Sequence, residues 1–494
     1  MLFGYSVRWA PTGASVRVLA ASVALGLVAG CGGGGGGGTP PPPPPPAPVN
    51  QAPVFTSANS VAVAENVSGG IYQAAATDPE ANPIAYSVVG GADAARFAIT
   101  TGGQLSFVAS PNFDLPADSD GNNVYQVELA ASDGTARGTL TVSVTVSNSK
   151  EGIAVRRVGT GFTNPTAVSA ISDTFLLVAE KSGAIYGFNS QTGLRQLLVQ
   201  VPNVGGVGVV AALAGSDYFL TGRFFVMYHN AGGFLVVQEY LRNPAGTTGP
   251  NNFGPLLAVD APQYAGGGWL GYDPAGNLLI ATGDAGGAGD PSGSAQNDAS
   301  RLGKIIRATR NPDPFAGGSP VFYFLSVAAK GLHQPVGGFT FNGGLLIGDR
   351  GESVAEEVDL LPAGSGTANF GWPFKEGTKV VRGTPPAGVV DPVIEYSRTA
   401  AAVQGIVGGA ILRTGLSSTV GHYVFADRSG GIFSIPATEL ANGRTATAAT
   451  FERRTLDFTP DAGQIGEPVA VVGDEAGRVY IIDSDGEIFR VDQG

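Results

Sequence analysis

Short apolar stretches recur along the chain and are separated by turns rich in Gly, Asp, Asn and Pro. Some of these stretches alternate apolar and polar residues, and others are continuously apolar over four to six residues. No long segment keeps the 3.6-residue period of an amphipathic helix. Such a pattern is typical of strands and turns, so we predict an all-β fold.

The first folded unit is predicted to span residues 53–148. Alternating residues at 61–64, 84–88, 125–129 and 139–144 are separated there by turns containing Asp, Asn or Gly. Strands of this length and spacing suit a β-sandwich of the Greek-key kind.

A different pattern repeats through residues 152–492. An apolar strand is followed by an acidic residue and, one to three residues later, by glycine. The first gap between these acids holds a further hairpin candidate at 223–237. Six units of about 57 residues then fill the segment, a size that suits four-stranded blades. We predict a six-bladed β-propeller, and a multi-sheet domain without closure is the alternative. The repeated acids are Glu180, Asp284, Asp349, Asp427 and Asp483.

Residues 1–30 have the features of an export signal. They contain Arg8 and Arg17, no acid, and an apolar run at 18–30 that is too short to span a bilayer. The end of the run, Leu27-Val28-Ala29-Gly30-Cys31, resembles a bacterial lipobox, which implies that Cys31 becomes the lipidated first residue. The alternative is an ordinary secretory signal with a chance cysteine.

A tether is predicted for residues 31–52, where seven glycines and seven prolines follow the cysteine. Glycine gives a flexible joint and proline a stiff rod, so the segment suits a spacer above a membrane. A proline-rich ligand for a partner domain is the alternative. We therefore expect an exported lipoprotein, anchored on the periplasmic side or at the cell surface. Gly32 favours the outer membrane in a host that has one.

The composition of the chain limits the kinds of partner that we expect it to bind. The net charge is −12, and no basic cluster is interleaved with aromatic residues, which argues against nucleic acid. The single cysteine excludes an internal disulfide framework.

Acidic turns in residues 53–148 resemble the cadherin-like repeats of bacterial surface proteins. The matching segments lie at 64–66, 76–80, 112–123 and 131–134. The resemblance implies calcium held by carboxylates, which suits a cation that takes six to eight oxygens. The alternative is that these acids only form turns and carry solvated charge. The implied ligands are Glu65, Asp78, Glu80, Asp120 and Asp133.

Residues 155–492 resemble the soluble glucose and sorbosone dehydrogenases. The motifs that carry the resemblance are GGWL (267–270), DPAG (273–276), ATGDAGG (281–287), LGKIIR (302–307), GDRGESVAEEVDLL (348–361) and NFGWP (369–373). The resemblance implies a six-bladed propeller that oxidises sugars with pyrroloquinoline quinone (PQQ) and calcium. It also places calcium on the main-chain carbonyls of Gly351 and Glu352. Glu356 and Glu357 would either support that loop or cap a turn.

Two segments depart from the family pattern. Ala265 stands where the family has its base histidine, and alanine cannot accept a proton. His333 and Gln334 stand where the family has an arginine and an asparagine that contact PQQ. Either His333 is a relocated base, or the site has lost PQQ oxidation. Other cations in or near candidate loops are Arg301, Lys304, Arg307, Arg350, Lys375, Arg413 and Arg428.

Two functional hypotheses follow. In the first, the protein is a PQQ- and calcium-dependent oxidoreductase that acts on an aldose or another alcohol. His333 and Asp284 are its catalytic candidates, and His333, Gln334, Arg413 and Arg428 are its cofactor-binding candidates. In the second, the same propeller is a non-catalytic surface module that binds a glycan or a protein.

Overall fold

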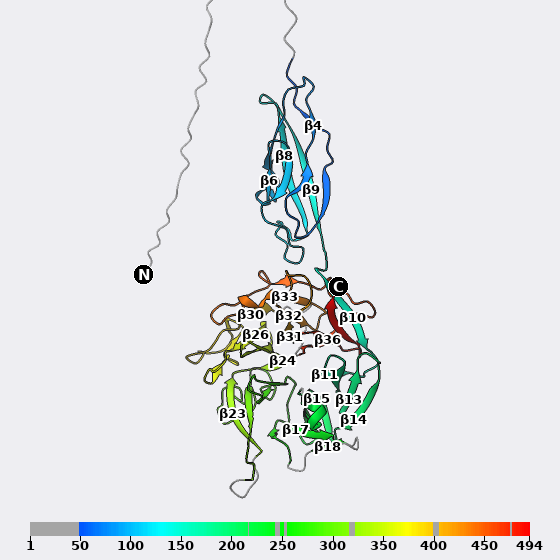
Figure 1. Cartoon of the computed structure of the whole chain (residues 1–494). Helices are drawn as coiled ribbons and strands as arrows, with labels where there is room; N and C mark the ends of the chain where they lie inside the picture. The colour runs from blue at the N-terminus through cyan, green and yellow to red at the C-terminus, as the bar shows by residue number, and fades with distance from the viewer. Residues whose placement is uncertain are drawn as a thin grey trace, which may run out of the picture. The chain divides into compact units, whose positions relative to one another are not determined.

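The computed structural model describes residues 49–215, 217–242, 248–250, 254–315, 322–398, 405–474 and 477–494. The regular elements of this part of the chain are almost all strands, with one short helix, α1 (Tyr218–Thr221), and two 3₁₀ turns, Ala94–Arg96 and Ala437–Glu439 (Figure 1). None of the helices in this part of the chain has the length and apolar character needed to cross a bilayer. The predicted all-β class is confirmed. The predicted leader, Cys31 and most of the tether lie outside the described residues.

Residues 54–147 form a two-sheet sandwich. Its core contains Leu105, Tyr125 and Val127, which are at most 1% exposed and come from both sheets. One sheet has the order β2 (Ser60–Ala64), β9 (Arg137–Ser147), β8 (Val124–Ser132), β5 (Ala85–Gly90), and the other β3 (Gly70–Gln73), β7 (Gln104–Phe107), β6 (Phe97–Ile99). The short strands β1 (Val54–Phe55) and β4 (Ala76–Thr77) pair with each other. Strand β2 runs parallel to β9, and the other pairs are antiparallel.

The first three propeller blades are antiparallel meanders that follow one another along the chain. Blade 1 is β11 (Pro165–Ala170), β12 (Phe175–Glu180), β13 (Ala184–Asn189) and β14 (Arg195–Gln200). Blade 2 is β15 (Val204–Ala214), β16 (Arg223–Asn230), β17 (Phe234–Arg242) and β18 (Thr248–Pro250), with β19 (Leu257–Asp260) also on β17. Blade 3 is β20 (Trp269–Tyr272), β21 (Leu278–Thr282), β22 (Lys304–Arg310) and β23 (Tyr323–Lys330), extended by β27 (Ala368–Asn369).

The remaining three blades repeat this arrangement. Blade 4 is β24 (Gln334–Phe341), β25 (Gly344–Arg350), β26 (Ala355–Leu361) and β30 (Ile394–Ser397), and its long loop holds the hairpin β28 (Lys375–Glu376) and β29 (Lys379–Val380). Blade 5 is β31 (Ile406–Ile411), β32 (His422–Asp427), β33 (Ile432–Pro436) and β34 (Glu452–Arg453). Blade 6 is β35 (Pro468–Gly473), β36 (Val479–Asp483), β37 (Ile488–Gln493) and β10 (Ile153–Gly159).

The six blades close into a ring. Each first strand contacts the first strand of the next blade, and β35 of the last blade contacts β11 of the first. Strand β10, the N-terminal strand of the propeller, pairs with β37 near the C-terminus, where Ile153 lies opposite Gln493. The last blade is therefore built from both ends of the propeller segment. The predicted six-bladed propeller is confirmed.

One end of the propeller carries the candidate site. Within each blade the start of the first strand lies beside the end of the second, as Gln334 lies opposite Arg350 in blade 4. We call this end the top face and the other end the bottom face. The second strands are buried on both sides, which explains their continuous apolar sequence; Leu278–Thr282 of β21 is buried at every residue.

Candidate functional site

Most of the repeated acids at the ends of the second strands hold their own blade together. Each accepts backbone N–H groups from the segment that leads into the first strand of the same blade. Of the donor residues, His333 and Gly405 are buried, and a buried N–H group needs an acceptor. Glu180 accepts from Thr163, Asp349 from His333 and Gln334, Asp427 from Gly405, and Asp483 from Gly466 and Glu467. The repeated motif therefore has a structural role in blades 1, 4, 5 and 6.

Asp284, the acid of blade 3, makes different contacts. Its Oδ2 accepts a hydrogen bond from Trp372 Nε1 at 2.6 Å, and its Oδ1 accepts from Gly286 N at 3.0 Å. Its backbone N–H donates to the carbonyl of His333 at 3.0 Å. Burial raises the pKa of Asp284, and the charge of His333 and the bond from Trp372 oppose that rise. The carboxylate of Asp284 thus holds Trp372 at the top face, whereas the other repeated acids hold the segment that leads into their own blade.

His333 has a ring nitrogen left open for an incoming proton. Its Nδ1 lies 2.6 Å from the carbonyl oxygen of Arg350. Because a carbonyl only accepts, Nδ1 carries the hydrogen and Nε2 presents a lone pair in the neutral ring. The ring centroid lies 4.5 Å from that of Trp372. His333, Trp372 and Asp284 therefore form one cluster, and all three side chains are largely buried.

The glycines after Ala265 allow blades 3 and 4 to meet closely. Gly267 has a φ of +79°, and a Cβ there would lie 2.8 Å from the Cα of Gln334. The N–H of Gly268 donates to the carbonyl of Pro335. Glycine is required here because any side chain would separate the two segments. Ala265 itself is exposed and presents only a methyl group.

Of the two carbonyl groups expected to bind calcium, that of Gly351 has another partner. Arg398 Nη1 donates to the Gly351 carbonyl at 2.6 Å and to Glu356 Oε1 at 2.6 Å. The carboxylate of Glu352 accepts from Gly289 N at 3.0 Å, and that of Glu357 accepts from Gly377 N. A guanidinium bonded to the carbonyl would repel a divalent cation at the same oxygen. The Gly351 carbonyl, held by Arg398, therefore does not fit calcium.

Two other arginines suit an anionic ligand. Arg350 is partly exposed and donates through Nε to the Ile406 carbonyl at 2.9 Å. Its terminal nitrogens have no hydrogen-bond partner among the described residues. Arg428 pairs with Glu467, while its buried Nε has no partner within the described ranges. Burial and then the charge of Arg428 lower the pKa of Arg350 to about 10. The unused donors fit a ligand with carboxylate groups, and PQQ has three.

Arg413 and Arg428 lie at opposite ends of blade 5. Arg428 follows Asp427, which pairs with Ile406 at the start of β31. Arg413 follows the end of that strand, where Ile411 pairs with Tyr423. The structure therefore places Arg428 at the top face with His333 and Gln334, and Arg413 at the bottom face. Gln334 is held there by its N–H, which donates to Asp349 Oδ1 at 2.6 Å.

Other candidate cations already have partners that are part of the fold. Lys304 is fully buried, and its Nζ donates to the carbonyls of Ser294, Ala295 and Leu302. Arg307 pairs with Asp273, and Lys375 pairs with Asp391.

With this geometry in place, comparison with known proteins identifies the family. The model of the glucose/sorbosone dehydrogenase family matches residues 162–409. The chain belongs to this family.

Solved structures of sugar dehydrogenases share the fold. A PQQ-bound aldose sugar dehydrogenase from Streptomyces coelicolor is 21% identical, with a TM-score of 0.53, and covers 69% of this chain and 98% of its own. A putative glucose dehydrogenase from Thermus thermophilus is 20% identical, with a TM-score of 0.50, and covers 69% and 100%. A calcium form of a Trichoderma reesei enzyme of family AA12 is 18% identical, with a TM-score of 0.51, and covers 70% and 96%. At these identities the likeness establishes the propeller fold.

In this glucose/sorbosone dehydrogenase propeller, the central channel holds a cavity of about 770 Å³. Most of its wall is formed by the first strands of the blades, and Trp269, Tyr272 and Phe339 supply aromatic surface. Arg413 lines it, whereas Gly351 and His333 do not. The cavity is therefore separate from the cluster at the top face.

The sandwich acids expected to bind calcium are used in turns and local contacts. Asp78 accepts from the backbone of Glu80 and Asn82, and Asp133 from that of Thr135 and Ala136. The remaining three accept as follows: Glu80 from Gln51, Asp120 from Asn122, and Glu65 from Phe113 and Ser149. Among the described residues two groups of carboxylates are close enough to share a cation, and neither includes any of these five.

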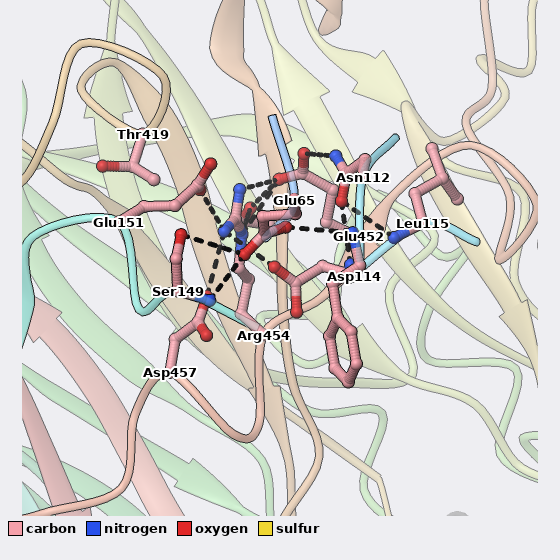
Figure 2. A network of polar contacts seen from close by, with 12 residues as sticks. Glu65, Asn112, Asp114, Leu115, Ser149, Glu151, Thr419, Glu452, Arg454 and Asp457 are labelled. Atoms are coloured by element: carbon pink, nitrogen blue, oxygen red, sulfur yellow. Dashed lines mark hydrogen bonds and ion pairs between the residues drawn. The ribbon is translucent and has the colours of Figure 1, made fainter. Parts of the chain in front are cut away.

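One of those groups surrounds a buried arginine. Arg454 is 2% exposed and pairs with four carboxylates: Asp114, Glu151, Glu452 and Asp457 (Figure 2). Asp114 belongs to the sandwich segment and Arg454 to the propeller segment, so this network joins residues 340 positions apart. Glu452 and Asp457 are neighbours of Arg454 in the sequence, but Asp114 and Glu151 are 340 and 303 positions away, so the local sequence does not reveal the whole network.

Other residues of the site were also not predicted from sequence. Trp372 lies within the NFGWP motif, which indicated its importance for the fold but not its bond to Asp284. Arg398 belongs to no motif, and only its contact with the Gly351 carbonyl reveals its place.

Proposed function

We propose that the protein is an oxidoreductase that removes hydrogen from a hydroxyl-bearing carbon of a sugar or another alcohol at the top face, with PQQ as its cofactor. The observation that carries the proposal is the His333 ring, whose Nδ1 is fixed by the Arg350 carbonyl so that Nε2 faces away as an acceptor. Membership of the glucose/sorbosone dehydrogenase family supports the class of substrate and reaction.

Each residue then has a definite task. PQQ, when bound, supplies a quinone that accepts hydride. The donors of Arg350 and Arg428 that lack partners would bind its carboxylates. His333 Nε2 accepts the proton of the substrate hydroxyl, as a general base does. Trp372, held by Asp284, packs against the imidazole with its ring tilted by 47°. No step is assigned to calcium at Gly351, because Arg398 occupies that carbonyl.

The test is a holoenzyme assay with added PQQ and a dye acceptor over a panel of sugars and alcohols. We expect PQQ to quench tryptophan fluorescence stoichiometrically and the dye to be reduced. His333→Gln should lower kcat by about 10²-fold to 10⁴-fold while leaving PQQ binding intact, because only the base is lost.

A matched control is His422→Gln, since His422 is also buried but bonds to Ser434 in blade 5. This variant should leave kcat near the wild-type value. The absence of both PQQ binding and dye reduction in the wild-type protein would refute the proposal.

A second candidate is binding of a glycan without oxidation. The channel cavity favours it, because aromatic side chains line a space large enough for a sugar and Arg413 stands at its bottom end. Glycan binding that persists without PQQ, together with no dye reduction, would favour this function. Glycan binding abolished by Arg413→Ala would locate it in the channel.

A further inference from the structure

The second group of close carboxylates lies inside blade 4. Asp349 is in β25, and Glu357 and Asp359 are in the neighbouring strand β26. Asp349 lies directly opposite Glu357 in the register, and Asp359 is two residues further along the same strand. Because side chains alternate between the two sides of a strand, all three project from the same side of the sheet.

The surroundings of this group are apolar. Leu345, Ile347 and Leu361 project from the same side and pack in a core with Ile305 and Ala329 of blade 3. The three acids are 1%, 6% and 0% exposed, for Asp349, Glu357 and Asp359 respectively. Carboxylates buried in such a place need compensating charge or hydrogen bonds.

The fold supplies donors to two of the acids and none to the third. Asp349 accepts the N–H groups of His333 and Gln334, and Glu357 accepts that of Gly377. Both oxygens of Asp359 are fully buried and have no hydrogen-bond partner in the part of the chain that the structure describes. The neighbouring charge that acts on Asp359 is that of Asp349, which has the same sign. Among the described residues, no lysine or arginine pairs with any of the three.

The spacing of the three acids suits one hard cation. One oxygen from each lies within 4.8 Å of the others. Calcium binds oxygens at about 2.3–2.6 Å, so two ligands on opposite sides of it are about 4.6–5.2 Å apart. Magnesium prefers shorter bonds and retains several waters, which a site this enclosed is less suited to hold.

We propose that Asp349, Glu357 and Asp359 bind a calcium ion inside blade 4. This site differs from the carbonyl site at Gly351, where Arg398 takes the place of a cation. The bound ion gives Asp359 its missing partner. It also fixes Asp349, and through Asp349 the backbone of His333 and Gln334 at the top face.

The proposal does not depend on the proposed oxidation, because its readouts are binding and stability. The full chain is stripped with EDTA and titrated with calcium by calorimetry, and bound calcium is counted by mass spectrometry of the metal. Asp359→Asn and Glu357→Gln should each weaken calcium binding at one site at least tenfold. Each should also lower the number of bound calcium ions by one per chain. Calcium should also slow amide exchange at residues 333–334 in the wild-type protein and not in the variants.

Asp120→Asn is the control, because Asp120 is an exposed acid of the sandwich and a candidate for a different calcium site. It should leave the blade 4 site unchanged. Without calcium, Asp359→Asn should be at least as stable to heat as the stripped wild-type chain, because the variant no longer buries an unpaired acid. Equal calcium binding by wild type and both variants would overturn the proposal. A second result would also overturn the proposal. In it, the wild-type chain binds no calcium at this site and shows an infrared band of protonated carboxyl groups, and Asp359→Asn removes that band.

Discussion

Single side chains distinguish the candidate site of this protein from the family pattern. His333 occupies a position where the family resemblance leads one to expect arginine, and the Arg350 carbonyl sets its tautomer. Ala265, at the expected position of the base, is exposed and inert. The proton acceptor proposed here thus comes from blade 4 rather than from the segment leading into blade 3.

Asp114 is a second residue whose protonation is set by its surroundings. Burial raises its pKa to about 8, against the opposing charge of Arg454 and with the help of Asp457. In the folded protein this carboxyl therefore holds its proton to a higher pH than in the unfolded chain, where its pKa is near the ordinary value of 3.8. This acid consequently lowers the stability of the fold as pH rises between those two values.

Asp114→Asn removes that titration. Relative to the wild type, the variant should gain at least about 1 kcal/mol of stability between pH 5 and pH 8, because asparagine cannot ionise. Chemical denaturation at the two pH values measures the difference. Asp120→Asn, with an exposed side chain, should show no such gain. If the stability of the wild type and that of Asp114→Asn change equally with pH, the pKa of Asp114 is not raised.

At the scale of elements, the acid at the end of the second strand is a recurring device. Its carboxylate accepts hydrogen bonds from backbone N–H groups in the segment that leads into the first strand. These N–H groups do not pair with a neighbouring strand. Blade 3 uses its acid differently, and the result is a tryptophan held against the proposed base.

Asp483→Ala tests this device in blade 6. The change removes the acceptor of the Gly466 and Glu467 N–H groups, which water can reach in part, so the free energy of unfolding should fall by about 2 kcal/mol. Urea denaturation measures it. Asp260→Ala, at an exposed strand end in blade 2, should stay within about 0.5 kcal/mol of wild type. A loss no larger than that of Asp260→Ala would show that Asp483 is dispensable.

At the scale of the whole molecule, the propeller joins the two ends of its own segment in blade 6, where β10 pairs with β37. A ring closed in this way brings loops from six blades to one face. Arg350, His333, Trp372 and Arg428 can then approach one another although nearly one hundred residues separate them along the chain.

Export and anchoring also belong to this scale, and they rest on the sequence before residue 49. We expect the chain to carry a lipid on Cys31. Cys31→Ser should abolish incorporation of radiolabelled palmitate and release the protein from the membrane fraction after cell lysis, because no other anchor is predicted. Labelling that survives the substitution would contradict the lipobox, and a wild type found only in the soluble fraction would contradict the anchor.

The sequence by itself determined the all-β class, the six repeated units and the family. These follow from local patterns, because strand periodicity, glycine turns and short motifs depend on residues that are near one another in the chain. The same patterns identified Asp284 and His333 as candidates, since each lies in or beside a motif.

Only the tertiary structure decided what those residues do. The bond of Arg398 to Gly351, the separation of Arg413 from Arg428, and the unpartnered Asp359 beside Asp349 are contacts between strands and loops. Such contacts depend on how strands pair and where the ring closes, which no local pattern records. The sequence therefore identified the propeller, and its closure determined which side chains meet at the site.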